Sequence, residues 1–339
     1  MKFITLTNEE GKTITVRFRS FRSTDAESVI NLVRDEYGEK YHKRKMYDKN
    51  YIIHADEEGS LKIFLAELID GKIIGMIGIQ RNLPKDRSCS IVSIITLKEY
   101  RKYGMFWHFA RYIYSRIRKM QNVSAIYCRM VTYHDMTQKL MERLGLKVCA
   151  FVPNLIIADK FQHSYPRDEN LKNTLVIMER KIQKSDVGTI YLSNEQVDIA
   201  NKIYTSLKLK YEINTEEAEM IGESEIEFAN DDNQETCTIE IHKSGVDLVT
   251  KIKEIHSQFT GKYQTFNIFL NISDPSAIKC YNELKKLGYF FTGFKPICED
   301  NEIMIMHNAG DVKINFDTLK LIDSFVELKN YIKESRNKN

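Results

Sequence analysis

The sequence contains no long apolar run, no paired-cysteine motif and no large excess of charge of one sign. None of its segments approaches the ~20 consecutive apolar residues that a membrane-spanning helix needs. The 50 basic and 47 acidic side chains are mixed along the chain and give a net charge of +3, unlike the clustered basic surface of nucleic-acid-binding proteins. We therefore expect a protein that binds neither a membrane nor nucleic acid.

The cysteine pattern argues against a metal-binding protein and against a disulfide-bonded secreted protein. The six of them lie far apart, with no Cys-x-x-Cys pair and no histidine at zinc-ligand spacing, so we expect no metal site. We interpret them as reduced core residues, which is typical of a cytoplasmic protein. The first residues lack a basic segment followed by an apolar one, so nothing there predicts secretion. The predicted location is cytoplasmic.

The length and the periodicity of apolar residues predict two domains of mixed α/β structure. A chain of 339 residues is long for one compact domain, and 42% hydrophobic with 29% charged residues is ordinary for a globular protein. Strand and helix patterns alternate through the first half. The expected strands are residues 13–19, 62–68, 72–79, 89–96, 124–132 and 147–157, and the expected helices begin near residue 23 and cover residues 107–120 and 135–144.

One stretch combines a buried strand, a basic turn and a helix. Residues 91–96 are apolar and rich in β-branched side chains, while apolar residues recur at helical spacing after residue 106. Gly104 lets the backbone of the turn approach a ligand closely, and the first amides of the helix have no partners inside it. Because Arg101 and Lys102 lie beside the positive end of the helix dipole, the turn predicts a site for a phosphate or pyrophosphate group.

The turn resembles a signature of the GNAT N-acetyltransferase superfamily, which holds acyl-CoA by its pyrophosphate. Arg101-Lys-Tyr-Gly104-Met-Phe106 is similar to the family's Arg-x-x-Gly-x-Gly/Ala, with Phe106 at the last small position. Residues 137–146 are similar to the second family signature, with Met141 in place of a tyrosine. The resemblance covers roughly residues 14–158 and implies acetyl-CoA, or another acyl-CoA, as co-substrate. The implied contacts are Ile94, Ile95, Thr96, Arg101, Lys102, Tyr103, Gly104, Met105, Phe106, His134 and Lys139.

The resemblance also leaves the proton transfers of the reaction open. Acyl transfer to a primary amine needs a polarised thioester carbonyl, a neutral amine and an acid for the leaving thiolate. The family uses amides of the strand before the turn to polarise the carbonyl. Met141 cannot donate a proton, so either the thiolate leaves unassisted or Tyr133 or His134 takes this part. The family's usual carboxylate falls at Cys89 or Ser90, so the base is His134 or a water molecule, unless His134 only contacts the cofactor.

Three further groups have two interpretations each. Glu67 and Glu36 face either a cleft or solvent, and the solvated position is the default for both. The tyrosine-rich residues 37–51 line a substrate cleft or pack on the edge of the sheet. Lys139 and Arg143 meet the phosphates of the cofactor or are solvated helix residues.

The second half of the chain repeats the first in a degenerate form. Leu287-Gly288, Phe294 and Pro296 follow Leu144-Gly145, Phe151 and Pro153 at a constant offset of 143 residues. The phosphate turn has no equivalent, because residues 242–246 contain one glycine and no Arg-x-x-Gly. We expect an acetyl-CoA-binding domain at residues 1–160, a connecting segment at 161–186 and a degenerate acetyltransferase-like domain at 187–339. Its expected elements are strands 188–192, 224–229, 236–242 and 265–271, helices 195–207, 246–259 and 275–287, and a closing helix 317–332.

The predicted function is an acyl-CoA-dependent N-acyltransferase, an N-acetyltransferase acting on the primary amine of a small molecule or a peptide. The alternative is a catalytically silent protein that senses acyl-CoA, which is favoured by Met141 and the missing carboxylate. A third interpretation takes the tandem domains as similar to aminoacyl-transferases that use charged tRNA. It is disfavoured because those proteins tend to lose the phosphate turn from the first copy, which keeps it here.

Overall fold

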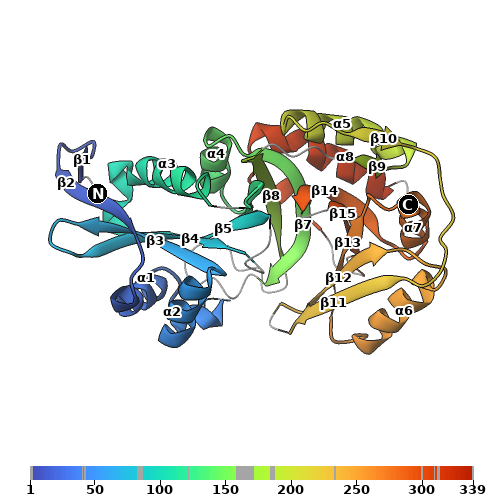
Figure 1. The fold of residues 1–339 in the computed structure, drawn as a ribbon, viewed down its shortest axis with the longest axis horizontal. Helices are drawn as coiled ribbons and strands as arrows, with labels where there is room; N and C mark the ends of the chain where they lie inside the picture. Colours follow the sequence, from blue (N-terminus) through green and yellow to red (C-terminus); the bar gives the residue numbers. More distant parts are fainter. Residues whose placement is uncertain are drawn as a thin grey trace. The chain divides into compact units, whose positions relative to one another are not determined.

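The structure is a computed structural model that describes residues 3–39, 41, 43–81, 87–120, 122–157, 172–183, 188–232, 234–263, 265–298, 301–308, 310 and 314–337. The chain divides into two compact units. The first runs to Cys128, and the second contains residues 129–157 and the described residues from 172 onward. Each unit carries helices on a mixed β-sheet, so the predicted mixed α/β fold class is confirmed (Figure 1). No helix in these ranges is long and apolar enough to cross a membrane.

The sheet of the first unit has the strand order β1-β2-β3-β4-β5-β6. All neighbours pair antiparallel except β5 and β6, which are parallel. Parallel neighbours need a crossover connection, and α3 provides it. The strands are β1 (Ile4–Thr7), β2 (Thr13–Ser20), β3 (Leu61–Leu68), β4 (Ile73–Gln80), β5 (Ser88–Thr96) and β6 (Ala125–Val131), whose last residues belong to the second unit; the helices are η1 (Ser23–Asp25), α1 (Ala26–Tyr37), η2 (Arg44–Tyr47), α2 (Lys49–Glu58), η3 (Lys98–Tyr103) and α3 (Met105–Ile117).

Helix α2 is the largest element of the first unit that the sequence did not predict. Its start is defined by Asp48, whose side chain accepts hydrogen bonds from the amides of Asn50 and Tyr51. Ile52 and Ala55 are buried in a core that also contains the apolar face of α1. The tyrosine-rich residues before α2 hide the helical period, because aromatic and charged side chains alternate there without a clear apolar face.

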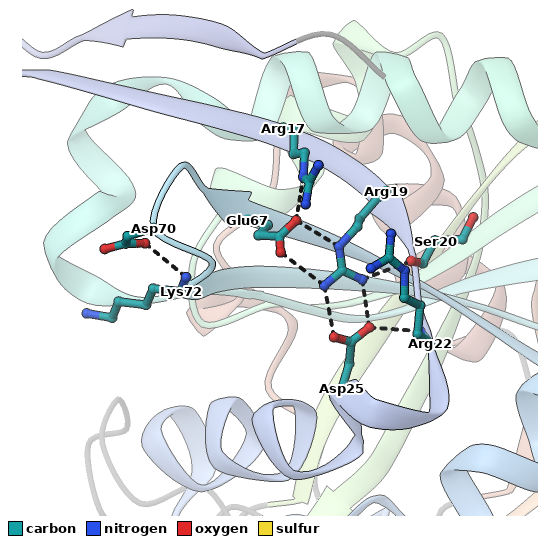
Figure 2. Close-up of polar contacts among 8 residues, drawn as sticks. All are labelled: Arg17, Arg19, Ser20, Arg22, Asp25, Glu67, Asp70 and Lys72. Carbon is teal, nitrogen blue, oxygen red and sulfur yellow. Dashed lines mark hydrogen bonds and ion pairs between the residues drawn. The ribbon is translucent and has the colours of Figure 1, made fainter.

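A buried ion-pair network joins β2, β3 and the start of α1 (Figure 2). Arg19 donates to both oxygens of Asp25, at 2.6 and 2.8 Å, and to Glu67 at 2.8 Å, while Arg17 also donates to Glu67. Asp25 in turn accepts the amide of Arg22, which fixes the turn before α1. Glu67 is therefore buried and paired, and the default expectation of a solvated position was wrong. Its strand pattern could not show that two arginines on β2 lie opposite.

The sheet of the second unit has the order β8-β7-β14-β15-β13-β12-β11. Gly293 pairs with Ala150 where β14 meets β7, and its φ of 141° suits glycine. A Cβ on Gly293 would lie 2.4 Å from the Cα of Ala150, so only glycine allows this approach. The elements are α4 (Met136–Arg143), β7 (Lys147–Ile157), β8 (Lys172–Lys181), β9 (Thr189–Tyr191), η5 (Asn194–Gln196), α5 (Val197–Ser206), β10 (Glu212–Asn214), β11 (Glu225–Asp231), β12 (Thr236–Lys243), α6 (Leu248–Gln258), β13 (Thr265–Asn271), α7 (Ala277–Lys286), β14 (Phe290–Cys298), β15 (Asn301–Asn308), η6 (Phe316–Thr318), η7 (Asp323–Phe325) and α8 (Val326–Asn337).

Most predicted elements of the second half are confirmed, with boundaries shifted by a few residues. The strand β13 covers the predicted residues, whereas the closing helix α8 begins at Val326, well after the expected start. The expected connecting segment contains β8, which pairs with β7, and the rest of that segment lies largely outside the described residues. The domain boundaries proposed from the sequence stay a prediction.

The carboxyl group of Glu179 on β8 is buried without a hydrogen-bond partner. Burial raises the pKa of this carboxyl well above its usual range, the charge of Glu302 acts in the same direction, and Lys295 opposes them. A neutral carboxyl is the form that tolerates such a position, because an ionised group without partners costs several kcal/mol more.

We expect Glu67→Gln to lower the free energy of unfolding by about 3 kcal/mol at pH 7, since it breaks a buried ion pair. Burial alone would raise the pKa of Glu67, but the hydrogen bonds from Arg17 and Arg19 outweigh it and lower the pKa to about 2. The contribution is present above the pKa of an unfolded glutamate and is lost as the pH falls towards 2. Urea unfolding at several pH values measures it. The exposed Glu9→Gln is the control, and equal losses in both variants would contradict the network's role.

Glu179 should give the wild-type protein the opposite pH dependence of stability, and Glu179→Gln should remove it. Because the pKa of Glu179 is raised in the folded protein, its unfolding releases a proton above the usual glutamate range, so stability falls as the pH rises there. The glutamine variant should remove this fall and be more stable than the wild type at pH 8 in urea unfolding. A variant less stable than the wild type at every pH would show that the carboxyl is needed.

Candidate active site

The turn between β5 and α3 forms an open, positively polarised backbone site. Gly104 has φ 62° and ψ 13°, the left-handed conformation, and it directly precedes the first residue of α3. No side chain caps the helix start. A Cβ placed on Gly104 would meet nothing within 4 Å, so space is open beside the unpaired amides of the first helical turn. An anion at this position would meet these amides and the positive end of the dipole.

The two basic residues of the turn are paired with carboxylates in this structure. Arg101 forms an ion pair with Glu36 at the end of α1, and its Nε donates to the carbonyl of Thr96 at 2.9 Å. Lys102 is largely exposed and lies 3.4 Å from Glu10. Glu36, for which the sequence left a cleft or a solvated position open, is the partner of Arg101. An anion that binds at Arg101 competes with Glu36.

Strand β5 carries a bulge just before this turn. Val92 pairs with Gly78 and Ile95 with Met76, so Ser93 and Ile94 stand opposite one residue of β4. Ser93 has φ 50°, which is uncommon for a residue with a side chain. Gly75 and Gly78 of β4 allow the close approach, because added Cβ atoms would lie 2.9 Å from the Ile95 carbonyl oxygen and 3.0 Å from Val92.

The bulge coincides with the end of the parallel pairing between β5 and β6. Register partners run from Ser88–Ala125 to Ile91–Cys128, and in the described residues β5 has no further partner on that edge. The amide of Leu97 donates to Ile74 of β4. Because hydrogen bonds alternate along an antiparallel pair, the amide of Ile95 also faces β4, whereas that of Thr96 faces away from it. Of the three strand amides expected to contact a cofactor, that of Thr96 thus faces away from β4, and that of Ile94 lies within the bulge.

The tyrosine-rich segment packs against this part of the sheet. Tyr41 is 3% exposed and belongs to the core beneath α1 and α2, while Tyr37, Tyr47 and Tyr51 are partly buried against the same core. Of the two interpretations, packing therefore describes the segment. The hydroxyl of Tyr41 lies 3.1 Å from Ser93 Oγ at the bulge. Sequence reasoning missed both residues, although two glycines within the β4 pattern are a recognised signal for a bulge or a close approach.

The remaining predicted site residues belong to the second compact unit. Partial burial lowers the pKa of His134, although the Asp135 charge opposes the shift, so its imidazole is neutral at pH 7. The rings of Tyr133 and His134 meet edge to face at 4.5 Å. Lys139 is exposed and pairs with Asp135 at 2.6 Å. Met141 is fully buried, so its side chain is a core residue of α4.

The described cysteines offer no activated nucleophile. Cys89, Cys128, Cys149, Cys237 and Cys280 are all free and buried, as expected for reduced core residues. Burial raises the pKa of Cys89 and of Cys128 to about 12, which removes the thiolate at neutral pH. Among the residues with described positions, no cluster of histidine, cysteine and carboxylate side chains has metal-ligand geometry.

At the corresponding turn of the second unit, backbone of the same unit occupies the space that is open at Gly104. A Cβ on Gly245 would lie 2.4 Å from the backbone of Glu223, so there is no open space as at Gly104. The side chain of Asp247 accepts the Ser224 amide at 2.8 Å beside the start of α6. The amides of this turn are also satisfied: Ser244 donates to Asp274 at 3.1 Å, Gly245 to Ser224 Oγ at 2.8 Å and Val246 to the Gly222 carbonyl at 3.0 Å. The amides of Ser244, Gly245 and Val246 are therefore not available to an anion.

Comparison with known proteins finds a family match in the first part of the chain. Residues 26–146 match the model of the Acetyltransferase (GNAT) family. Similar solved structures include the spermidine/spermine N-acetyltransferase SpeG from Vibrio cholerae, with 13% identity, a TM-score of 0.39 and coverage of 49% of this chain and 95% of its own. The ribosomal-protein-S18-alanine N-acetyltransferase from Escherichia coli has 14% identity, a TM-score of 0.38 and coverage of 50% and 96%. No curated protein matches the chain.

We expect one coenzyme A site per chain, in the first unit, and Gly104→Asp should weaken binding at least about fivefold. The substitution brings a negative charge to amides that face an anion, which costs about 1–3 kcal/mol. Gly104→Ala is the matched control, because it adds the same Cβ to open space without the charge. Calorimetric titration measures stoichiometry and affinity. Two equivalent sites, or unchanged affinity in Gly104→Asp, would contradict this assignment.

Proposed function

We propose that the domain at residues 26–146, which belongs to the Acetyltransferase (GNAT) family, transfers the acetyl group of acetyl-CoA to a primary amine. The family uses acetyl-CoA as its co-substrate. The observation that carries the proposal is the arrangement of β5: a bulge with free amides, followed at once by the open Gly104 turn. The two features lie on one strand and its own turn, so a single ligand with an acyl end and a phosphate end fits both.

The residues of the turn would hold the pyrophosphate of the co-substrate. The amides of Met105 and Phe106 begin α3 directly after the open space at Gly104, and Arg101 would exchange Glu36 for a phosphate oxygen. Such an exchange is favourable when the incoming group carries more charge and accepts bidentate hydrogen bonds. Tyr103 flanks the turn and packs against Tyr100. These contacts bind and orient the co-substrate without taking part in proton transfer.

The amides of Ile94 and Thr96 would act at the acyl end. Fixed backbone N–H groups stabilise the negative charge that develops on a carbonyl oxygen under attack, and removing one such donor typically costs about 10²–10³ in rate. Their direction depends on the bulge, because the extra residue of β5 interrupts the regular pairing with β4. Polarisation of the thioester is therefore a property of the backbone of β5.

Proton removal from the acceptor amine is assigned to His134 or to water. The lowered pKa of His134 keeps its imidazole neutral and able to accept a proton at pH 7. No proton donor stands at Met141 for the leaving thiolate, so Tyr133 or His134 supplies the proton or the thiolate leaves unassisted.

A catalytically silent acyl-CoA sensor is the second candidate. Two observations favour it: Met141 is a fully buried core residue, and Cys89 and Ser90 occupy the strand position where the family often has a carboxylate. A sensor would bind coenzyme A at the Gly104 turn and release no thiol with any amine.

The enzyme should release free thiol from acetyl-CoA when a primary amine is present, and the rate should rise with pH. An amine of lysine type has a reference pKa of about 10.4, so its reactive neutral form increases throughout the range from pH 6 to 9. A screen of polyamines, amino acids and peptides with free N-termini, read by thiol release and mass spectrometry of the product, tests this. Binding of coenzyme A without thiol release above hydrolysis, across the whole screen, supports the sensor instead.

His134→Ala should lower kcat by roughly 10²-fold if the imidazole is the base. If His134 only contacts the cofactor, the variant should instead raise KM for acetyl-CoA and leave kcat nearly unchanged. The exposed His54→Ala serves as the control for loss of an imidazole. Steady-state kinetics with both substrates varied separates the two roles, and wild-type values of both constants would remove His134 from the mechanism.

A further inference from the structure

We infer that Tyr41 is a positioning residue that holds the β5 bulge in place through the side chain of Ser93. The inference rests on the proposed acetyl transfer, because it assigns to Tyr41 the orientation of the amides that polarise the thioester. Tyr41 precedes β5 by some fifty residues in sequence, in the segment between α1 and α2, yet its hydroxyl lies 3.1 Å from Ser93 Oγ.

The backbone of Ser93 needs such support. Its φ of 50° lies in the left-handed region, where the Cβ of an L-residue crowds the following carbonyl group. Residues with side chains remain in this conformation only when the surroundings hold them there. Ser93 is buried, and among the residues that the structure describes its hydroxyl has Tyr41 as its only hydrogen-bond partner. The contact with Tyr41 is therefore the side-chain interaction that stabilises the bulged conformation.

Tyr41 is itself held in place on two sides. Its ring stacks on Tyr37 with centroids 4.2 Å apart and planes 7° from parallel. Its amide donates to the hydroxyl of Tyr47 at 3.0 Å, and that hydroxyl donates to the carbonyl of Gly38. These contacts restrict the position of the Tyr41 side chain and its hydroxyl relative to β5. Because the residue is 3% exposed, it acts on a ligand through Ser93 rather than by contact.

The contact stays intact throughout the pH range of an assay. Burial raises the pKa of Tyr41 to about 12, and the hydrogen bond with Ser93 offsets the shift only in part. The hydroxyl is thus protonated below pH 10. Any effect of removing it should be the same at pH 6 and pH 9, which distinguishes Tyr41 from a group that donates or accepts the reaction's protons.

The first test is the kinetics of Tyr41→Phe, which removes the hydroxyl and keeps the ring. We expect kcat to fall about tenfold, because misaligned amides lose part of the stabilisation that oriented donors give. KM for acetyl-CoA should change by less than about twofold, since the pyrophosphate contacts at Gly104 are untouched. Tyr51→Phe is the matched control, as it removes a hydroxyl from the same packed segment. A wild-type kcat in Tyr41→Phe, or an equal loss in Tyr51→Phe, would overturn the inference.

A substitution at Ser93 distinguishes a positioning role of Tyr41 from a general contribution of Tyr41 to packing. Glycine adopts φ 50° without strain, so Ser93→Gly should not need the hydroxyl of Tyr41. We expect the double variant Tyr41→Phe/Ser93→Gly to have the same kcat as Ser93→Gly alone. A further tenfold loss in the double variant would show that Tyr41 acts elsewhere.

A measurement that does not depend on enzyme activity distinguishes this inference from the proposed function. Hydrogen exchange followed by mass spectrometry of peptides covering residues 88–97 should be faster in Tyr41→Phe than in the wild type, and unchanged in Tyr51→Phe. Faster exchange in a protein that transfers no acetyl group would leave the role of Tyr41 in place and reject the enzyme. Unchanged exchange in Tyr41→Phe would reject the role of Tyr41 even in an active enzyme.

Discussion

The candidate site depends on one backbone constraint, the bulge of β5 between Val92 and Ile95. Up to Ile91 β5 pairs on both edges, and in the described residues its register beyond Ile91 is with β4. At the bulge two residues of β5 pass one of β4, so the strand changes direction. The proposed function uses backbone amides beside this bulge to bind the acyl end of a ligand. The glycines of β4 and the packed tyrosines allow and maintain this local departure from regular pairing.

The second unit contains a parallel strand pair without such a bulge in its described residues. Its parallel pair, β12 and β13, stays in register over six consecutive residue pairs, from Thr236–Thr265 to Ile241–Leu270. Its turn is closed by the segment before β11, and a carboxylate stands beside the start of α6. The space and the amides proposed as a ligand site in the first unit thus have no open equivalent at this turn, where Ser244, Gly245 and Val246 donate to other groups of the second unit.

Local patterns predicted the strands, the Gly104 turn and most helices, because each depends on residues near one another in sequence. Ala150 and Gly293, which are register partners, are also separated by 143 residues, while the internal repeat stays a prediction. The bulge at Ser93, the contact with Tyr41 and the pairing of Glu67 with two arginines were not predicted. Each depends on which residues face each other across strands, and alternation along one strand does not contain that information. Helix α2 was missed because aromatic packing replaced its apolar period.

The ion pair between Arg101 and Glu36 makes the end of α1 an intramolecular competitor for the anion site. Glu36 is held at a fixed distance from Arg101 by the packing of α1 on β4 and β5, so its effective concentration does not change with that of any ligand. A bound phosphate and a bound Glu36 exclude each other at the guanidinium group. By thermodynamic reciprocity, occupancy of the turn loosens the last turn of α1 to the same extent as α1 weakens the affinity for the ligand. If the proposed ligand binds at this turn, its affinity depends partly on α1 through the pairing of Glu36 with Arg101.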